Sequence, residues 1–198
     1  MIQADVHGQT LHLETAPRLF SPRGIDAGTL AMLAHVEFSP HDKVLDLGCG
    51  YGVIGIHAAK CMDPTRVYML DNDPEAVTLA RTNAVSNSVA GVHVTQSDGF
   101  HDFPEAGFTL ILCNPPYHAD FSLPKHFIHK GFNRLKVGGK LWMVTQRAPW
   151  YRNKLQAIFG DVKVHREGPY RVFEATKHSP RYANAKRPLV SVRKPANR

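Results

Sequence analysis

The tetrapeptide Asn114-Pro115-Pro116-Tyr117 combines residue types that could orient a planar amine for reaction. An exocyclic amine of guanine or adenine, or a glutamine amide, donates its lone pair into the neighbouring π-system and is a poor nucleophile. The carboxamide oxygen of Asn114 and the carbonyl of Pro115 could both accept its N–H bonds and aim the lone pair at an electrophile. The two prolines would fix the loop, and Tyr117 offers a face for stacking. The tetrapeptide therefore predicts group transfer to a planar nitrogen, with a plain loop after a strand as the alternative.

A glycine-rich segment between Gly48 and Gly55 is the second candidate for a site. It follows an apolar, strand-like run, and its glycines permit a tight turn and close approach of a ligand to the backbone N–H groups. The helix that follows would present its N-terminus to that ligand. The spacing of Gly50, Gly52 and Gly55 matches the fingerprint of dinucleotide sites, and Asp71 follows 71 − 50 = 21 residues later. A glycine-rich turn without a ligand is the alternative.

The charge of Asp46, two residues before the first glycine, argues against a dinucleotide. Its carboxylate would lie beside an anionic pyrophosphate and repel it. S-adenosylmethionine (SAM) has no phosphate and carries an ammonium and a sulfonium, both of which attract a carboxylate. The loop therefore favours SAM over NAD.

Polar residues end four successive strand-like runs, in the order Asp46, Asp71, Asp98 and Asn114. The carboxyl ends of parallel strands form the ligand-binding edge of an open α/β sheet. Asp71 is placed to accept both ribose hydroxyls of an adenosine, and Asp98 could accept the adenine amine. The predicted cofactor-binding residues are Asp46, Gly48, Gly50, Asp71, Asn72, Asp98 and Asn114. The histidines and cysteines show no metal-ligand spacing, so no metal site is predicted.

Strand-like and helical runs alternate along the chain in a way that positions these residues. Residues 4–20 suggest an antiparallel pair, and Gly138-Gly139 suggests a turn. The pattern predicts an α/β fold with a doubly wound, mostly parallel seven-stranded sheet and an antiparallel C-terminal hairpin. The first strand of this sheet is expected to begin at Val44. The other expected strands cover 67–70, 92–96, 108–113, 141–145, 162–166 and 170–176. The expected helices cover 30–36, 53–60, 74–86, 125–135 and 150–159.

The composition fits one globular domain, because 43% of the 198 residues are hydrophobic and 21% are charged. Nothing resembles a signal peptide or a membrane span, so we expect a cytoplasmic protein. Residues 177–198 hold seven Lys or Arg and no acid, which leaves 24 − 7 = 17 basic residues against 17 acidic ones in residues 1–176. We expect a domain over 1–176 and a basic, disordered tail over 177–198. The tail is either a nucleic-acid-binding arm or a solvated terminus.

Together these motifs resemble those of class I SAM-dependent methyltransferases. The segment Phe20 to Thr29, with the run Leu45 to Gly55, is similar to the small-domain methyltransferases, whose best-known members modify guanine N2 in ribosomal RNA. The resemblance covers about residues 5–176. It implies a Rossmann-like fold, SAM as cofactor, and a catalytic segment of Asn114, Pro115, Pro116 and Tyr117. Phe20 and Asp26 are candidates for a lid over the cofactor or for packing alone.

The sequence therefore predicts a SAM-dependent N-methyltransferase that acts on RNA, most simply on guanine N2 of ribosomal RNA or of a ribosomal subunit. A protein glutamine N-methyltransferase is an alternative, because such enzymes share the Asn-Pro-Pro-Tyr motif; the basic tail favours RNA. A catalytically silent RNA-binding module is a third possibility. The intact motifs at all four strand ends count against it.

Overall fold

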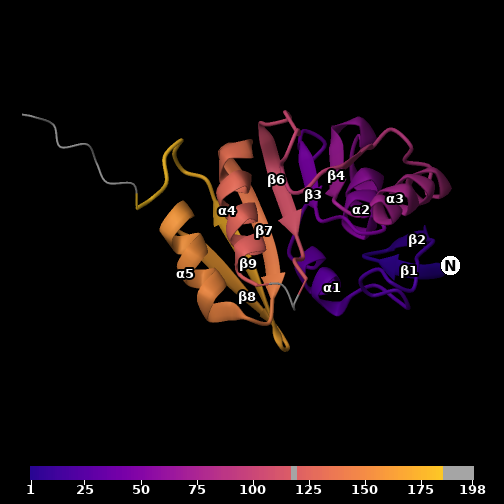
Figure 1. Cartoon of the computed structure of the whole chain (residues 1–198), viewed down its shortest axis with the longest axis horizontal. Helices are drawn as coiled ribbons and strands as arrows, with labels where there is room; N and C mark the ends of the chain where they lie inside the picture. Colours follow the sequence, from indigo (N-terminus) through magenta and orange to yellow (C-terminus); the bar gives the residue numbers. More distant parts are fainter. Residues whose placement is uncertain (117–119, 185–198) are drawn as a thin grey trace, which may run out of the picture.

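Seven strands form the central sheet of the computed structural model, which describes residues 1–116 and 120–184 (Figure 1). The strand order is β5-β4-β3-β6-β7-β9-β8. The last two strands form an antiparallel hairpin and the others run parallel. The bounds are β3 (Val44–Leu47), β4 (Val67–Asp71), β5 (His93–Gln96), β6 (Phe108–Cys113), β7 (Leu135–Thr145), β8 (Val162–Glu167) and β9 (Tyr170–Thr176). The predicted doubly wound sheet with a C-terminal hairpin is confirmed.

Helices cover both faces of this sheet, and a separate core lies under each set. One face carries α1 (Ala27–Leu33), α2 (Val53–Cys61) and α3 (Pro74–Ser86), and the other carries α4 (Ser122–Arg134) and α5 (Ala148–Phe159). A short 3-10 turn, η1 (Pro64–Arg66), precedes β4. Val44 of β3 belongs to one core, whereas Leu45 and Leu47 belong to the other. Because both faces of β3 are buried, its apolar residues point to both sides of the sheet, and Asp46 is the one polar residue within the strand.

The N-terminal hairpin of β1 (Ile2–Val6) and β2 (Gln9–Leu13) is the predicted antiparallel pair and forms a sheet of its own. Two buried asparagines hold it, Asn83 of α3 and Asn87 directly after that helix. The Asn83 amide accepts from the Glu14 N–H at 2.7 Å and donates to the Glu14 carbonyl at 2.9 Å. Asn87 makes the same pair of bonds to His12, at 3.0 and 2.7 Å. These amides replace the neighbouring strand that the hairpin edge lacks.

Local sequence explains how α2 and α3 are placed. Asp73 caps α3 by accepting from the Glu75 N–H at 2.9 Å, and Pro74 occupies the first helical position, as predicted. Helix α2 lies so close to β4 that a β-carbon on Gly55 would stand 2.2 Å from the sulfur of Met69. A side chain at position 55 would therefore require the side chain of Met69 to move, so glycine suits the close approach of the helix to the sheet.

Strand β7 is longer than expected, because Gly138 and Gly139 lie within it and do not form a turn. The Gly138 N–H donates to the Lys177 carbonyl at 2.8 Å, and the Lys177 N–H donates to the Gly139 carbonyl at 2.9 Å. A β-carbon on Gly139 would lie 2.8 Å from the Phe108 carbonyl oxygen. The β6–β7 register shifts between Phe108 and Leu110, where the chains approach this closely. Pairing with the segment after β9 thus extends the strand through the predicted turn.

The ordered chain also continues past Thr176, where we expected the domain to end. The side chain of Lys177 is buried and its Nζ donates to the carbonyls of Phe132 and Leu135, at 2.8 and 2.7 Å. The ring of Tyr182 lies 4.9 Å from that of Phe132, and the Ala183 N–H donates to the Ile158 carbonyl at 2.9 Å. Residues 177–184 therefore pack on the domain. The prediction of a disordered tail remains only for residues 185–198, which lie outside the described part.

The helices of the described residues are short. The longest, α3 and α4, have 13 residues each, and none in residues 1–116 and 120–184 combines the length and apolar character needed to cross a bilayer. In the same part of the chain, no three potential metal-ligating side chains come together.

Candidate active site

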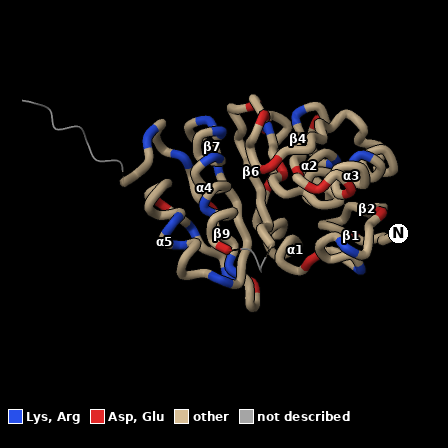
Figure 2. The backbone as a smooth tube through the Cα atoms, in the orientation of Figure 1, with Lys and Arg blue, Asp and Glu red and all other residues tan. Residues whose placement is uncertain are grey.

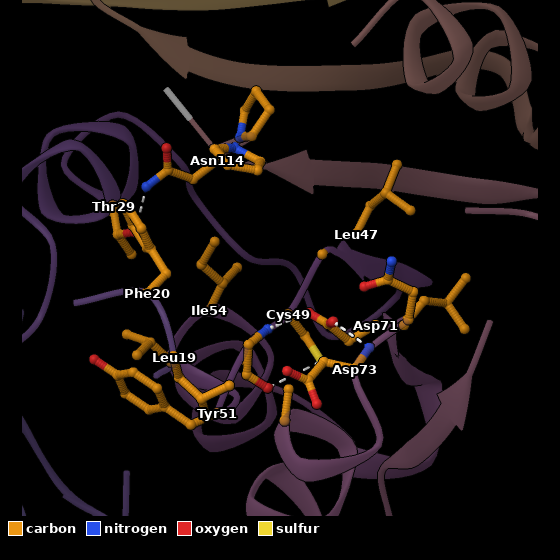
Figure 3. A pocket seen from close by; sticks show the side chains of 18 of the residues that line it. Leu19, Phe20, Thr29, Leu47, Cys49, Tyr51, Ile54, Asp71, Asp73 and Asn114 are labelled. Atoms are coloured by element: carbon orange, nitrogen blue, oxygen red, sulfur yellow. Dashed lines mark hydrogen bonds between the residues drawn. The ribbon is translucent and has the colours of Figure 1, made fainter. Parts of the chain in front are cut away.

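A cavity of about 340 Å³ opens at the carboxyl ends of β3, β4 and β6. Its size is typical of small-molecule sites, and its position is that of ligand sites in open α/β sheets. Figure 3 shows side chains from the Phe20 segment, the glycine loop and the ends of β4 and β6 around it. The cavity wall includes nearly all of the predicted site: Gly48, Gly50, Asp71, Asn72, Asp98, Asn114, Pro115 and Pro116. Tyr117 lies outside the described residues.

The glycine loop leaves room for a ligand. Gly48 and Gly50 have φ values of +75° and +54°, which favour glycine. Apart from the adjacent residues, a β-carbon at either position would meet no atom of the described residues within 4 Å, so no described side chain fills the space beside the loop. The N–H groups of Gly48 and Cys49 both donate to the Leu70 carbonyl at 2.9 Å. The end of β4 thus fixes the loop without closing the cavity.

Asp71 joins the two loops that flank the cavity. One carboxylate oxygen accepts from the Gly50 N–H at 2.8 Å, and the other accepts from the Asp73 N–H at 3.0 Å. Each oxygen keeps a further lone pair, so the carboxylate can still accept from two vicinal hydroxyls. The neighbouring Asp98 turn is tied to this point, because the Ser97 N–H donates to the Asp71 carbonyl at 2.8 Å. The structure therefore brings together the two strand ends assigned to ribose and adenine.

Asp46 does not line the cavity, and its contact with the cofactor stays a prediction. Its side chain is fully buried beneath the loop, and one oxygen accepts from the Gly55 N–H of α2 at 2.9 Å. The other oxygen has no hydrogen-bond partner among the described residues. Burial raises the pKa of Asp46 to about 7, the Gly55 bond opposes the rise, and the charge of Asp71 adds to it. Asp46 thus acts on the site by holding the start of α2.

The carboxamide of Asn114 is held in one orientation. Its nitrogen donates to the Asp26 carboxylate at 2.8 Å and to the Thr29 hydroxyl at 2.9 Å, which uses both amide hydrogens (Figure 3). Asp26 also caps α1 by accepting from the Thr29 N–H at 3.1 Å. The buried carboxamide oxygen of Asn114 has no partner among the described residues. Helix α1 therefore leaves Asn114 with an acceptor atom for a donor that enters the cavity.

The sequence did not predict the part that Thr29 plays, because a threonine inside an amphipathic helix carries no pattern of its own. It also missed Tyr51, the variable residue between two loop glycines, whose hydroxyl lies 3.1 Å from the Ser21 carbonyl and 3.2 Å from the Gly24 carbonyl. Tyr51 thereby ties the glycine loop to the Phe20 segment. Phe20 and Asp26 both line the cavity, and a lid function for them stays a prediction.

Among known proteins, the chain resembles methyltransferases along most of its length. It is 33% identical to the uncharacterized protein YbxB of Bacillus subtilis over 165 residues, which is 80% of this chain and 82% of that protein. It is 30% identical over 172 residues to the ribosomal RNA small subunit methyltransferase C of Pseudomonas putida, covering 84% of this chain and 51% of the relative. The large subunit methyltransferase G of Shewanella amazonensis is 31% identical over 181 residues, 87% of this chain and 47% of the relative.

A solved structure shares the fold. The 16S rRNA N2 methyltransferase of Thermus thermophilus, in complex with AdoMet and guanosine, superposes with a TM-score of 0.82 at 24% identity, over 89% of this chain and 50% of that one. This chain spans about half the length of the ribosomal RNA methyltransferases that it matches. The model of the family described as methyltransferase small domain matches residues 10–174. The chain therefore belongs to the methyltransferase small domain family.

Proposed function

We propose that this chain is a SAM-dependent N-methyltransferase of ribosomal RNA and that guanine N2 receives the methyl group. The observation that carries the proposal is the orientation of Asn114, whose nitrogen is held by two acceptors while its oxygen has no partner within residues 1–116 and 120–184. An acceptor of this kind suits an amine that must give up its conjugation to react.

The described residues fit SAM. Asp71 would accept the ribose hydroxyls, and the Asn72 and Asp98 segments would flank the adenine. The open space beside Gly48 and Gly50 would admit the amino-acid part of the molecule. When bound, SAM supplies a methyl group on a positively charged sulfur.

The chain's own contribution to the chemistry is to hold the amine. The carbonyl of Pro115 and the oxygen of Asn114 would accept its two N–H bonds, which withdraws the lone pair from conjugation with the ring and directs it at the methyl group. No strong base is required, because the nitrogen becomes acidic only as the methyl group arrives. Asp26 and Thr29 keep the Asn114 amide from rotating into the orientation that would present a donor.

The RNA substrate is supported by the relatives, two of which are named as ribosomal RNA methyltransferases. Guanine N2 is supported by the solved structure that shares the fold. The orientation of Asn114 would serve a glutamine amide equally well, so a protein substrate is the second candidate.

Methyl transfer from labelled SAM to total RNA and to total protein tests the proposal, with nucleoside analysis of the labelled RNA. We expect label in RNA as N2-methylguanosine. Label in protein alone would overturn the RNA assignment, and bound SAM without any transfer would indicate a silent module. Asn114→Ala should abolish most of the label, whereas Asn133→Ala, an exposed amide on α4, is the matched control.

A further inference from the structure

A groove of about 330 Å³ lies between the first turns of α5 and the facing ends of β8 and β9. Three arginines line it: Arg152 from α5, Arg166 from β8 and Arg171 from β9. We call it the arginine groove. Lys and Arg segments lie along α5 and beside β9 in Figure 2. In the part of the chain that the structure describes, no acidic side chain lines the groove.

Among the described residues, the arginines of the groove have no acidic partner, although Arg171 donates to the carbonyls of Gly168 and Tyr170 at 3.0 and 2.7 Å. Arg166 and Arg171 stand directly opposite each other in the β8–β9 ladder, and like charges at such positions destabilise a hairpin. Glu167 points to the other face of the sheet, where it bonds His35 at 2.8 Å. Within residues 1–116 and 120–184, Arg152, Arg166 and Arg171 form no ion pair. An anionic partner would remove this repulsion.

The groove opens at the same edge of the sheet as the Asn114 site. Strand β9 runs antiparallel to β7, and its Arg171 pairs with Thr145 at the carboxyl end of β7. Asn114 follows the carboxyl end of β6, which lies beside β7 in the sheet. A chain molecule bound in the groove therefore passes close to the proposed methylation site.

An aromatic platform lies at this edge as well. The rings of Phe121 and Trp150 stack at 4.4 Å with an interplanar angle of 19°, and the Arg147 guanidinium lies 3.9 Å from the centre of the Phe121 ring. Phe121 immediately precedes α4, and Trp150 lies in the first turn of α5. Aromatic rings beside arginines are typical of single-stranded nucleic acid sites, where bases stack and phosphates pair with the cations.

We propose that the arginine groove binds the phosphate backbone of the RNA substrate next to the nucleotide that is methylated. The identity of the partner rests on the proposed function. Guanidinium groups pair with phosphate through two parallel hydrogen bonds, which suits three arginines around one groove. The surface thus sets the path of the RNA, and Asn114 acts on the base that this path delivers.

The test compares two double variants of the full chain. Arg152→Gln with Arg166→Gln removes two exposed groove charges, and Lys60→Gln with Lys136→Gln removes two exposed charges from the end of α2 and the start of β7, at the other edge of the sheet. Fluorescence anisotropy follows binding of a labelled single-stranded RNA of about 20 nucleotides of mixed sequence over a range of salt concentrations. Two lost phosphate contacts should flatten the slope of log affinity against log salt by about 1.4 and weaken binding about tenfold at physiological salt.

The groove variant should show this loss and the control variant should not. The midpoint of thermal unfolding of the groove variant should not fall, because Arg166→Gln removes a like-charge pair. Equal RNA affinities and salt slopes for both variants would overturn the assignment, and this would also be the result if the groove served a protein partner. Binding is measured without SAM, so loss of RNA affinity in the groove variant supports the surface even if methyl transfer to RNA is absent and the proposed function fails.

Discussion

One hydroxyl of helix α1 helps to orient Asn114, beside the hydrogen bond to the Asp26 carboxylate. Thr29 is buried, and its oxygen takes one of the two amide hydrogens of Asn114. Thr29→Val should keep the volume but free that hydrogen, so that the amide can rotate and present a donor to the substrate. We expect kcat to fall about tenfold or more with little change in SAM affinity, the scale of one misplaced catalytic contact.

Thr29→Ser, which keeps the hydroxyl, is the control for the Thr29 prediction. Single-turnover methyl transfer measures the rate of the chemical step, and calorimetry measures the affinity for SAM, so a change in one can be told from a change in the other. If Thr29→Val and Thr29→Ser turn over equally, the hydrogen bond to Asn114 does not determine the orientation of the amide.

The second prediction for a single residue concerns Asp71. Asp71→Ala should weaken SAM binding by roughly 2 to 4 kcal/mol, because two charge-assisted hydrogen bonds to the ribose are lost. The variant also leaves the N–H groups of Gly50 and Asp73 without their acceptor, so it should loosen the glycine loop. Calorimetry with SAM and with NAD measures both expectations: NAD should not bind either protein. Unchanged SAM affinity would remove Asp71 from the site.

At the scale of elements, one buried carboxylate joins strand β3 to helix α2. The pKa of Asp46 is raised to about 7 in the folded chain, from 3.8, chiefly by burial. A raised carboxyl pKa means that the folded state holds a proton that the unfolded state has lost, so the contribution to stability is complete below about pH 4 and is lost as the pH rises to about 7. The loss is roughly 1.4 kcal/mol per pH unit in that window.

Asp46→Asn keeps an acceptor for the Gly55 N–H and removes the titration. Urea unfolding of both proteins between about pH 4 and pH 8 should show the stability of the wild type falling relative to the variant up to about pH 7 and then running parallel to it. Parallel curves throughout would mean that Asp46 titrates normally.

Much of the arrangement of elements follows from the sequence. Continuous apolar runs predicted the parallel strands, and the Asp73-Pro74 pair predicted the start of α3. The hydrogen bonds of Asn83 and Asn87 to the N-terminal hairpin could not be predicted, because they join residues 69 and 75 positions apart. Gly138-Gly139 was interpreted as a turn because local preference cannot show that Lys177 returns to pair with it.

The same reasoning applies to the candidate site. Nearly all of the residues predicted from strand ends and loop glycines lie in the cavity wall, because topology alone brings them to one edge. The burial of Asp46 could not be predicted, because charge complementarity does not show whether a side chain points into a cavity or beneath it. The link from Thr29 to Asn114 joins residues 85 positions apart and has no sequence pattern.

At the scale of the whole molecule, we expect residues 177–184 to contribute to stability and residues 185–198 not to do so. Truncation after Thr176 removes Lys177, whose bonds satisfy carbonyls at the end of α4, and should lower the free energy of unfolding by roughly 2 to 4 kcal/mol. Truncation after Asn184 should leave the stability unchanged. It removes 7 − 2 = 5 basic residues, since Lys177 and Arg181 remain.

RNA binding then decides between the two interpretations of residues 185–198. If they form an electrostatic arm, the chain ending at Asn184 should show a salt slope flatter by about 2 or more, since each phosphate contact contributes about 0.7. SAM affinity and turnover at saturating RNA should not change. An unaltered slope would identify a solvated terminus.

The close packing of Gly55 against Met69 couples the substitutions that these two positions can accept. A methyl group at position 55 would overlap the sulfur at position 69, so a lineage that exchanged the glycine first would pass through an overpacked core. A lineage that first shortened the side chain at 69 would pass only through a cavity, and the second change could then fill it. A smaller residue at position 69 should therefore come before a larger residue at position 55. Among descendants of this chain, we expect substitutions at the two positions to occur together.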